Sequence, residues 1–388
     1  MSLSATPPPR GTRPRNRRAL IRDAATELFA QRGYANVAVS DIAAAVNVGA
    51  SAVYRHYAGK ADLLFDAIDT ALEATLTALP TDEGADLPQI AAVLARATLD
   101  TREAGVLLQR ESRNLSPDAA AQIRKKRVQI SGWLTTEIAA RRPELTTEQA
   151  ELLGVCASDT LTSISFHRQV LPRPEFDDLL ADLATRILRM DPPADTTRET
   201  RARRPKPASR ADEILDAATD LFAERGYAEV SIDDIGAAVG IAGPSVYNHF
   251  ASKQDILVDA LARGLRGLRA AMDTARDEGR TPAEVLRRLS DAYVDLTLDH
   301  PSLVIAMIHE LIHLGSEARA AEARRLQREF IQDWVALAGA HHPDDPVVTR
   351  IKVQAAQMMA NDVARTPRLR RIPGLRATAR DAAWLLQQ

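Results

Sequence analysis

The chain has 388 residues, a length that favours two or three domains over a single core. A hydrophobic fraction of 45%, a charged fraction of 26% and a net charge of −2 are typical of a globular protein, and they confine any nucleic-acid contact to a local surface. One cysteine excludes a disulfide framework and a four-thiolate zinc site, and the lack of a signal-like or long apolar stretch predicts a cytoplasmic protein without a membrane span.

Two segments of the chain are basic and lack apolar periodicity. Residues 1–18 carry five arginines and no acidic residue, and residues 191–210 are rich in proline, threonine and arginine. Such compositions predict a disordered arm and an interdomain linker. Nearly every stretch outside these segments has helical periodicity, and no stretch alternates as strands do, so we expect an all-α protein.

A long repeat dominates the organisation of the chain. Residues 21–66 occur again at residues 214–259, without a gap and at an offset of 193. Over residues 22–66 the copies share 25 of 45 positions, which indicates a duplicated and fused gene. Weaker similarity continues beyond them, and Trp133 aligns with Trp334. A period this long, used twice, predicts a tandem domain pair, with about nine helices per repeat: three short ones, a longer fourth and five more.

Each repeat contains two short helices joined by a tight turn. In the second repeat we expect helices over residues 232–239 and 244–250, with residues 240–243 as the turn. Gly240 suits a turn position with positive φ, and the first repeat has Asn47 there, the next most tolerant residue type. This pattern predicts a helix-turn-helix, a module that places its second helix in the major groove of DNA.

The second helix of each copy offers side chains suited to DNA. Hydroxyl groups and histidine contact phosphates, arginine reads guanine, and asparagine reads adenine. A lysine at the start of the following helix is placed for a phosphate contact, and the basic arms can enter the minor groove. Tyr57 and Phe250 are expected in the core. The predicted DNA-binding residues are Ser51, Tyr54, Arg55, His56 and Lys60 in the first copy and Ser245, Tyr247, Asn248, His249 and Lys253 in the second.

The repeated pattern AAxxLFAxRGYxxV…DIxxAV…SVYxHFxxKxxLL resembles the N-terminal domain of TetR-family transcriptional regulators. The resemblance implies an all-α fold of two tandem TetR-like units, each with a three-helix helix-turn-helix head and a helical body for ligand binding and dimerisation. Since both units lie in one polypeptide, it also implies an intramolecular pseudo-dimer. The helices implied at its interface are residues 147–168 and 176–189 in the first unit and 346–365 and 377–386 in the second.

The repeat and the two basic segments set the domain boundaries. The predicted order is a basic disordered arm at residues 1–18, a helix-turn-helix DNA-binding domain at 19–66, a helical body at 67–190, a basic proline-rich linker at 191–210, a second helix-turn-helix DNA-binding domain at 211–259 and a second helical body at 260–388. Each predicted head is thus preceded by a basic segment.

The resemblance implies a DNA-binding transcriptional regulator rather than an enzyme, without a cofactor or metal. It implies a one-component repressor that a small apolar, acyl-type effector releases from its operator. The sequence departs from the family pattern in two places. The usual hydroxyl N-cap of the second helix is replaced by Ala38 in the first copy, whereas Ser231 keeps it in the second. The recognition sequences GASAVYRHY and AGPSVYNHF also differ, so we expect an asymmetric operator. The residues expected at an effector site are Glu111, Trp133, Phe166, Met307, His309, Glu310, His313, Trp334 and Met358.

A competing interpretation comes from the sequence His309-Glu310-Leu-Ile-His313, which matches the HExxH zinc motif. On a helix the two histidines share one face, and the glutamate could act as a base. The aligned site in the first repeat lacks both histidines. The motif has only three fixed residues, so a zinc hydrolase or a metal-sensing regulator is kept as the alternative function.

Overall fold

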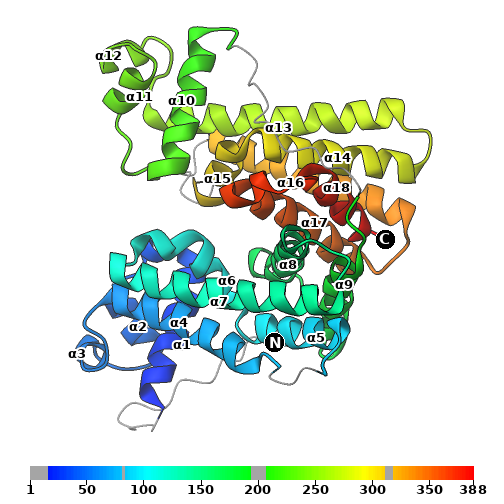
Figure 1. Cartoon of the computed structure of the whole chain (residues 1–388). Helices are drawn as coiled ribbons and strands as arrows, with labels where there is room; N and C mark the ends of the chain where they lie inside the picture. The colour runs from blue at the N-terminus through cyan, green and yellow to red at the C-terminus, as the bar shows by residue number, and fades with distance from the viewer. Residues whose placement is uncertain (1–15, 81–83, 194–206, 311–317) are drawn as a thin grey trace. The chain divides into compact units, whose positions relative to one another are not determined.

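The computed structural model describes residues 16–80, 84–193, 207–310 and 318–388, and in these ranges it is helical without any strand. The side chains of residues 307–310 and 318–320 lie outside this description. The chain divides into two compact units, Met1–Arg189 and Met190–Gln388 (Figure 1). None of the described helices is long and apolar enough to cross a membrane.

Unit 1 has a head of three helices and a body of six. The head helices are α1 (Arg17–Arg32), α2 (Val39–Ala45) and α3 (Ala50–Tyr54). The body helices are α4 (Lys60–Ala78), α5 (Leu87–Asp100), α6 (Arg102–Val106), α7 (Pro117–Arg141), α8 (Thr147–Thr162) and α9 (Glu175–Arg189). Short turns lie between them: η1 (Tyr34–Asn36), η2 (Leu107–Glu111), η3 (Ser112–Asn114) and η4 (Ser163–Phe166). In the body, α9 packs against α5 and α8, and α7 packs against α4 and α8.

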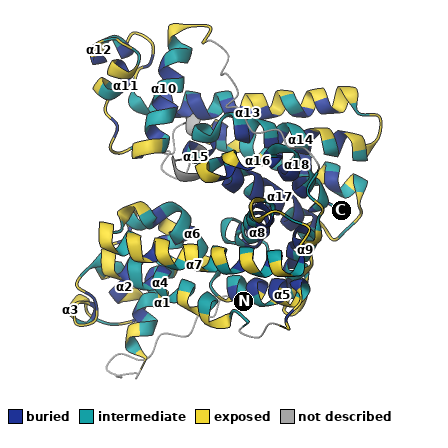
Figure 2. Ribbon diagram, viewed as in Figure 1, coloured by how far each residue is buried: buried dark blue, intermediate teal, exposed yellow. Residues whose placement is uncertain are grey.

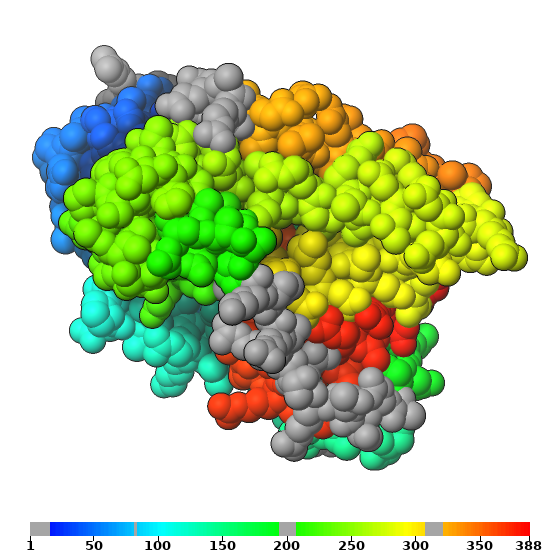
Figure 3. Space-filling view, turned by 90° about the horizontal axis from the view of Figure 1, so that it is seen from above, coloured from blue at the N-terminus to red at the C-terminus, as the bar shows by residue number. Residues whose placement is uncertain are grey.

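Unit 2 repeats this order in its described part. The head helices are α10 (Arg210–Arg225), α11 (Ile232–Ala238) and α12 (Gly243–Val246). The body helices are α13 (Lys253–Glu278), α14 (Pro282–Asp299), α15 (Pro301–Glu310), α16 (Ala318–His341), α17 (Pro346–Arg365) and α18 (Leu375–Leu385), with a short turn η6 (Pro367–Arg371). The central helix is α14, which packs against α13, α16, α17 and α18; α13 and α14 run side by side along one face of this unit (Figure 3).

The helix count agrees with the sequence-based expectation, because each unit shows nine α-helices among its described residues. Several begin at the predicted caps. The Ser116 hydroxyl accepts a hydrogen bond from the Ala119 amide, and the Thr281 hydroxyl accepts one from the Glu284 amide at 3.2 Å. A proline follows each of these caps at the first helical position, where its missing N–H leaves no intrahelical bond unmade.

The predicted basic arms are shorter in the structure than in the sequence analysis. Helix α1 begins at Arg17, and Arg18 forms an ion pair with Asp66 of α4 at 3.0 Å. Helix α10 begins at Arg210, where the Ser209 side chain caps the helix. The remaining parts of the predicted arm and linker, residues 1–15 and 194–206, lie outside the described residues.

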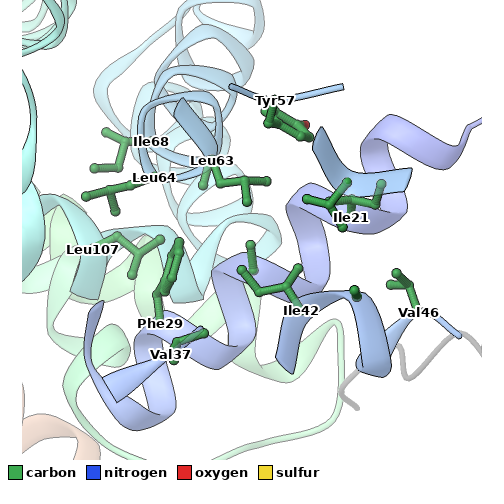
Figure 4. Packing of buried hydrophobic residues seen from close by; sticks show 14 of the residues in the cluster. Ile21, Phe29, Val37, Ile42, Val46, Tyr57, Leu63, Leu64, Ile68 and Leu107 are labelled. Atoms are coloured by element: carbon green, nitrogen blue, oxygen red, sulfur yellow. The ribbon is translucent and has the colours of Figure 1, made fainter. Parts of the chain in front are cut away.

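Each head has an apolar core that includes residues from its own body. In unit 1 the core is built around Ile21, Phe29 and Ile42, all fully buried, and Leu107 of η2 completes it from the body (Figure 4). In unit 2 the matching core contains Phe222 and Ile235, and Ala306 of α15 joins it. Burial of large aliphatic and aromatic side chains is the main stabilising contribution, about 1.5–3 kcal/mol for each one. The head therefore does not fold independently of the body beneath it.

The outer surface of the body contrasts with this core. Helix α7 buries Ile123, Leu134 and Ile138 and leaves long exposed stretches between them (Figure 2).

In unit 2 the body core contains an aromatic cluster of Tyr293 and Trp334, whose ring centroids lie 5.1 Å apart in an edge-on arrangement. The Trp334 indole N–H donates to Gln387 Oε1 at 2.7 Å, so the polar atom of this buried ring is satisfied.

The single cysteine of the chain, Cys156, is fully buried on α8, and burial raises the pKa of its thiol above the ordinary value. Near pH 8.5 an exposed cysteine is about half ionised and reacts with water-soluble disulfide reagents. We expect the native protein to remain unlabelled by such a reagent at pH 8.5, and the protein unfolded in guanidinium chloride to take up one equivalent. Rapid labelling of the native protein would contradict the burial of this thiol.

Candidate nucleic-acid interface

The turn between the second and third helices has the predicted backbone in both heads. Asn47 has φ of 54° and Gly240 has φ of 72°, both in the left-handed region. Each is followed by an amide that closes the turn: the Val48 N–H donates to the Ala43 carbonyl, and the Ile241 N–H donates to the Gly236 carbonyl, each at 2.9 Å. A positive φ is accessible to glycine and asparagine at low cost, which explains the residue types at this position.

The second helices of the two heads differ in how they begin. In α11 the Ser231 hydroxyl accepts from the Asp234 amide at 3.1 Å, and the Asp234 carboxylate accepts from the Ser231 amide at 2.8 Å. The first head keeps only the second of these bonds, from the Ala38 amide to Asp41 Oδ2 at 2.8 Å. The departure noted in the sequence therefore removes half of a reciprocal cap.

The recognition helices α3 and α12 are shorter than predicted. Helix α12 ends at Val246, and the predicted residues 247–249 form a tight turn in which Tyr247 N–H donates to the Pro244 carbonyl and Asn248 N–H to the Ser245 carbonyl, both at 3.2 Å. In the first head α3 ends at Tyr54. Of the predicted DNA-binding residues, Arg55 and His56 follow α3, and Tyr247, Asn248 and His249 follow α12.

Three consecutive exposed side chains lie between two buried ones in each recognition segment. Tyr54 is 56% exposed and Tyr247 is 55% exposed, unusual values for a large aromatic residue. The buried residues on either side anchor the segment, and they include the predicted core residues Tyr57 and Phe250, which are 4% and 8% exposed. The exposed residues are Tyr54, Arg55 and His56 in unit 1 and Tyr247, Asn248 and His249 in unit 2.

The two predicted serines do not occupy equivalent positions. At the offset of 193, Ser51 aligns with Pro244, and Ser245 aligns with Ala52. Ser51 is exposed and Ser245 is half-buried. The two heads therefore present a hydroxyl group at different places, in addition to the difference between Arg55 and Asn248.

The two lysines predicted to contact phosphate have partners inside the protein. The Lys60 ammonium donates to the carbonyls of Tyr34 and Val37 at 2.6 and 3.0 Å, and it lies 4.1 Å from the centroid of the Tyr34 ring. The Lys253 ammonium donates to the carbonyls of Tyr227 and Val230, both at 2.8 Å. Each lysine thus ties the start of the fourth helix to the segment between the first and second helices. We call this arrangement the lysine clamp, and it was missed in the sequence because its partners are 26 and 23 residues away.

The predicted effector residues belong to both units: Glu111, Trp133 and Phe166 lie in unit 1 and the others in unit 2. Glu111 is buried, and its Oε2 accepts from the Asn114 amide group at 3.0 Å. Trp334 lies in the aromatic core of unit 2, while Trp133, Phe166 and Met358 are half-buried. The side chains of Met307, His309 and Glu310, and the whole of His313, lie outside the described residues, and so does the predicted zinc site. Among the described residues, no group of three or more histidine, cysteine or carboxylate side chains is arranged to hold a metal ion.

Comparison with known proteins gives two matches to one family model, described as bacterial regulatory proteins of the tetR family, at residues 21–67 and 214–260. The chain is 31% identical over 177 residues to the HTH-type transcriptional repressor KstR2 of Rhodococcus jostii (strain RHA1), covering 45% of this chain and 81% of that protein. It is 29% identical over 151 residues to the HTH-type transcriptional regulator EthR of Mycobacterium tuberculosis (strain ATCC 25618 / H37Rv), covering 38% and 66%. A further relative is the HTH-type transcriptional activator FasR of Mycolicibacterium smegmatis (strain ATCC 700084 / mc(2)155), 29% identical over 119 residues, covering 30% and 52%.

The unequal caps lead to a paired prediction. Ser231→Ala should destabilise α11 by about 1 kcal/mol, because it removes the acceptor for the Asp234 amide. Ala38→Ser should stabilise α2 by an amount up to that size, because Asp41 already supplies the reciprocal bond. Amide hydrogen exchange over residues 232–238 and 39–45 measures both effects, and the unaltered head of each variant is its internal control. Equal exchange in variant and parent at both helices would contradict this account.

Proposed function

The chain belongs to the TetR family of DNA-binding transcriptional regulators, and on this premise we propose that one polypeptide supplies both heads of the family's dimeric arrangement. The support is that the family model matches twice and that each match is followed by a helical body of six described helices. In this proposal, α8 and α9 of unit 1 and α17 and α18 of unit 2 form the interface that two separate subunits would otherwise make.

The difference between the two recognition segments carries the proposal for the operator. Arg55 presents a planar set of donors that matches O6 and N7 of guanine, whereas Asn248 at the aligned position matches N6 and N7 of adenine. Both side chains are exposed and lie just after the C-terminal ends of their recognition helices. We therefore propose an asymmetric operator of two different half-sites, with centres about one helical turn of DNA, ~34–36 Å, or a multiple apart.

We also propose that the protein is a repressor whose DNA affinity is lowered by a small apolar effector bound in one or both bodies. The name of KstR2 as a repressor favours repression, although FasR is named an activator. An effector can shift the DNA-binding equilibrium only by its difference in affinity for the two states, typically about 1–3 kcal/mol. Leu107 and Ala306 belong to the bodies but pack in the head cores, so each body contacts its own head directly.

A mobility-shift assay of the purified chain on the DNA beside its own gene tests the proposed function. The assay is run at about 0.15 M salt with excess competitor DNA, because non-specific binding weakens steeply with salt. We expect a discrete complex of one chain per site, with a footprint that covers two unlike half-sites. Only salt-sensitive smearing on this DNA and on operators selected from genomic DNA would contradict a sequence-specific regulator.

The reading residues can be tested one head at a time. Arg55→Ala should relax base discrimination in one half-site, and Asn248→Ala should relax it in the other, each by about 1–3 kcal/mol. Selection of binding sites from random DNA measures the preference at every position. Arg124→Ala, which removes an exposed arginine on α7, is the control and should leave both half-sites unchanged. Unaltered preferences in both head variants would show that other residues read the bases.

The pseudo-dimer has its own consequence for binding at low concentration. Since the two heads are joined by one chain, their effective concentration does not change on dilution. Operator titration should follow a simple hyperbola with a Hill slope near 1 down to nanomolar protein. A slope near 2, or a loss of affinity that tracks dissociation of two chains in sedimentation velocity, would require a dimer of chains instead.

A further inference from the structure

A short π-helical turn in unit 1, η2 (Leu107–Glu111), joins α6 to the rest of the body. Turns of this kind are rare, and they are frequently found at functional sites. Leu107 at its start belongs to the head core, and Glu111 at its end is buried. Between them lies Arg110, a basic residue that neither the DNA-binding surface nor the apolar core uses.

The guanidinium of Arg110 is placed against an aromatic ring but lacks an acceptor. Its Cζ lies 5.3 Å from the centroid of the Phe166 ring in η4. Its Nε is fully buried and, among the described residues, has no hydrogen-bond partner. Burial lowers the pKa of Arg110, an effect that the nearby charge of Glu111 opposes, but the Glu111 carboxylate is already bonded to Asn114. The Arg110 side chain as a whole is half-buried. An arginine remains protonated under these conditions, so a half-buried positive charge lies beside Phe166 without a direct anionic partner.

Arg102 of α6, in the same region, has a structural role, because its guanidinium is hydrogen-bonded to neighbouring backbone. Its Nε donates to the Ile164 carbonyl at 2.6 Å, and its terminal nitrogen donates to the His167 carbonyl and lies 3.2 Å from His167 Nδ1. These bonds tie α6 to η4 and the residues after it. Arg110 lies two turns further along the same stretch and makes no comparable bond to the described residues, so holding α6 and η4 together does not account for it.

A second polar group in the same place also lacks a partner. The Ser165 hydroxyl is buried and, in the part of the chain that the structure describes, makes no hydrogen bond. It packs against Gly105 of α6 so closely that a Cβ at that position would collide with it. The absence of a side chain at Gly105 thus lets η4 approach α6, with Ser165 facing α6 and Phe166 facing Arg110.

Buried polar groups without partners are costly, and an uncompensated buried charge costs more than a neutral group. A bound anion would remove this cost, because the planar donors of a guanidinium match the two oxygens of a carboxylate. We propose that the body of unit 1 binds a small organic carboxylate, whose anionic group pairs with Arg110 beside Phe166. This rests on the proposed effector function and assigns the effector a chemical class: an apolar molecule with a carboxylate rather than a neutral one.

The site is expected once per chain. In the alignment of the two repeats, Glu111 corresponds to Glu310, so Arg110 corresponds to His309. An imidazole lacks the forked donors of a guanidinium and is largely neutral above its ordinary pKa. Unit 2 is therefore not expected to offer an equivalent carboxylate site.

Titration calorimetry with a panel of paired compounds tests this assignment. The panel contains octanoate, decanoate, benzoate and 3-phenylpropanoate, each compared with its neutral primary amide and, for anion chemistry alone, with inorganic phosphate. We expect at least one carboxylate to bind with one site per chain and its amide to bind about tenfold to hundredfold more weakly. Arg110→Met should weaken the carboxylate by the same factor and leave the amide unchanged.

Two further variants make the result interpretable. Arg113→Met, which removes an exposed arginine three residues away, should bind as the parent does. In the absence of ligand, Arg110→Met should have a thermal midpoint equal to or above that of the parent, because it removes a half-buried charge that has no direct anionic partner. A lowered midpoint would indicate a structural arginine. Equal affinity for carboxylates and amides, binding of phosphate alone, or no binding by any carboxylate would overturn the proposal.

Failure of this site and failure of the proposed effector function give different results. If the carboxylate binds through Arg110 but leaves operator affinity unchanged, the site stands and regulation by it does not. If a neutral compound releases the operator equally from the parent and from Arg110→Met, regulation stands and the carboxylate site does not. The mobility-shift assay with each ligand at saturation separates these cases.

Discussion

The continuity of apolar packing between each head and its own body is the constraint on which the rest of the structure depends. The three helices of a head span only about 40 residues, a size at which a chain usually buries too little surface to be stable without further support. Leu107 and Ile123 fill the base of the first head, and Ala306 fills that of the second. The orientation of each recognition segment is therefore set by body residues as much as by its own helices.

The turn η2 concentrates this coupling within a few residues. Leu107 packs in the head core, Arg110 lies against Phe166, and Glu111 lies close to Gly33 at the end of α1. Burial and the charge of Glu111 together raise the pKa of Tyr34, the ring beneath the clamp lysine. Arg110 lies less than one helical turn after Leu107, which packs in the head core. A structural change at Arg110 therefore reaches the head through directly packed residues.

The features that could be predicted from the sequence are those determined by local chemistry. Helical periodicity and caps such as Thr281 located the helices, and the tolerance of Asn47 and Gly240 for positive φ located the turns. The early end of α12 was not visible, because residues 247–249 contain no helix-breaking residue. Features that depend on distant partners were also missed: the lysine clamp needs backbone carbonyls from the turn after the first helix, and the Trp334 N–H needs Gln387 as its acceptor. By the same reasoning, nothing in the sequence distinguishes Arg102 from Arg110, whose partners come from η4.

The presence of two unlike recognition segments in one gene changes how a binding specificity can evolve. In a symmetric homodimer every substitution in the recognition helix appears twice on the DNA, so losing one good base contact, worth about 1–3 kcal/mol, counts double and is hard to survive. In this chain a substitution at Arg55 leaves Asn248 untouched. The lysine clamp is the same in both copies, and so are the tyrosine and histidine of the exposed triplet. Only its middle residue differs, Arg55 in one copy and Asn248 in the other, so the change is confined to the residue that reads the base. Such a regulator can acquire a new target one half-site at a time, by steps that each keep the contacts of the other half-site.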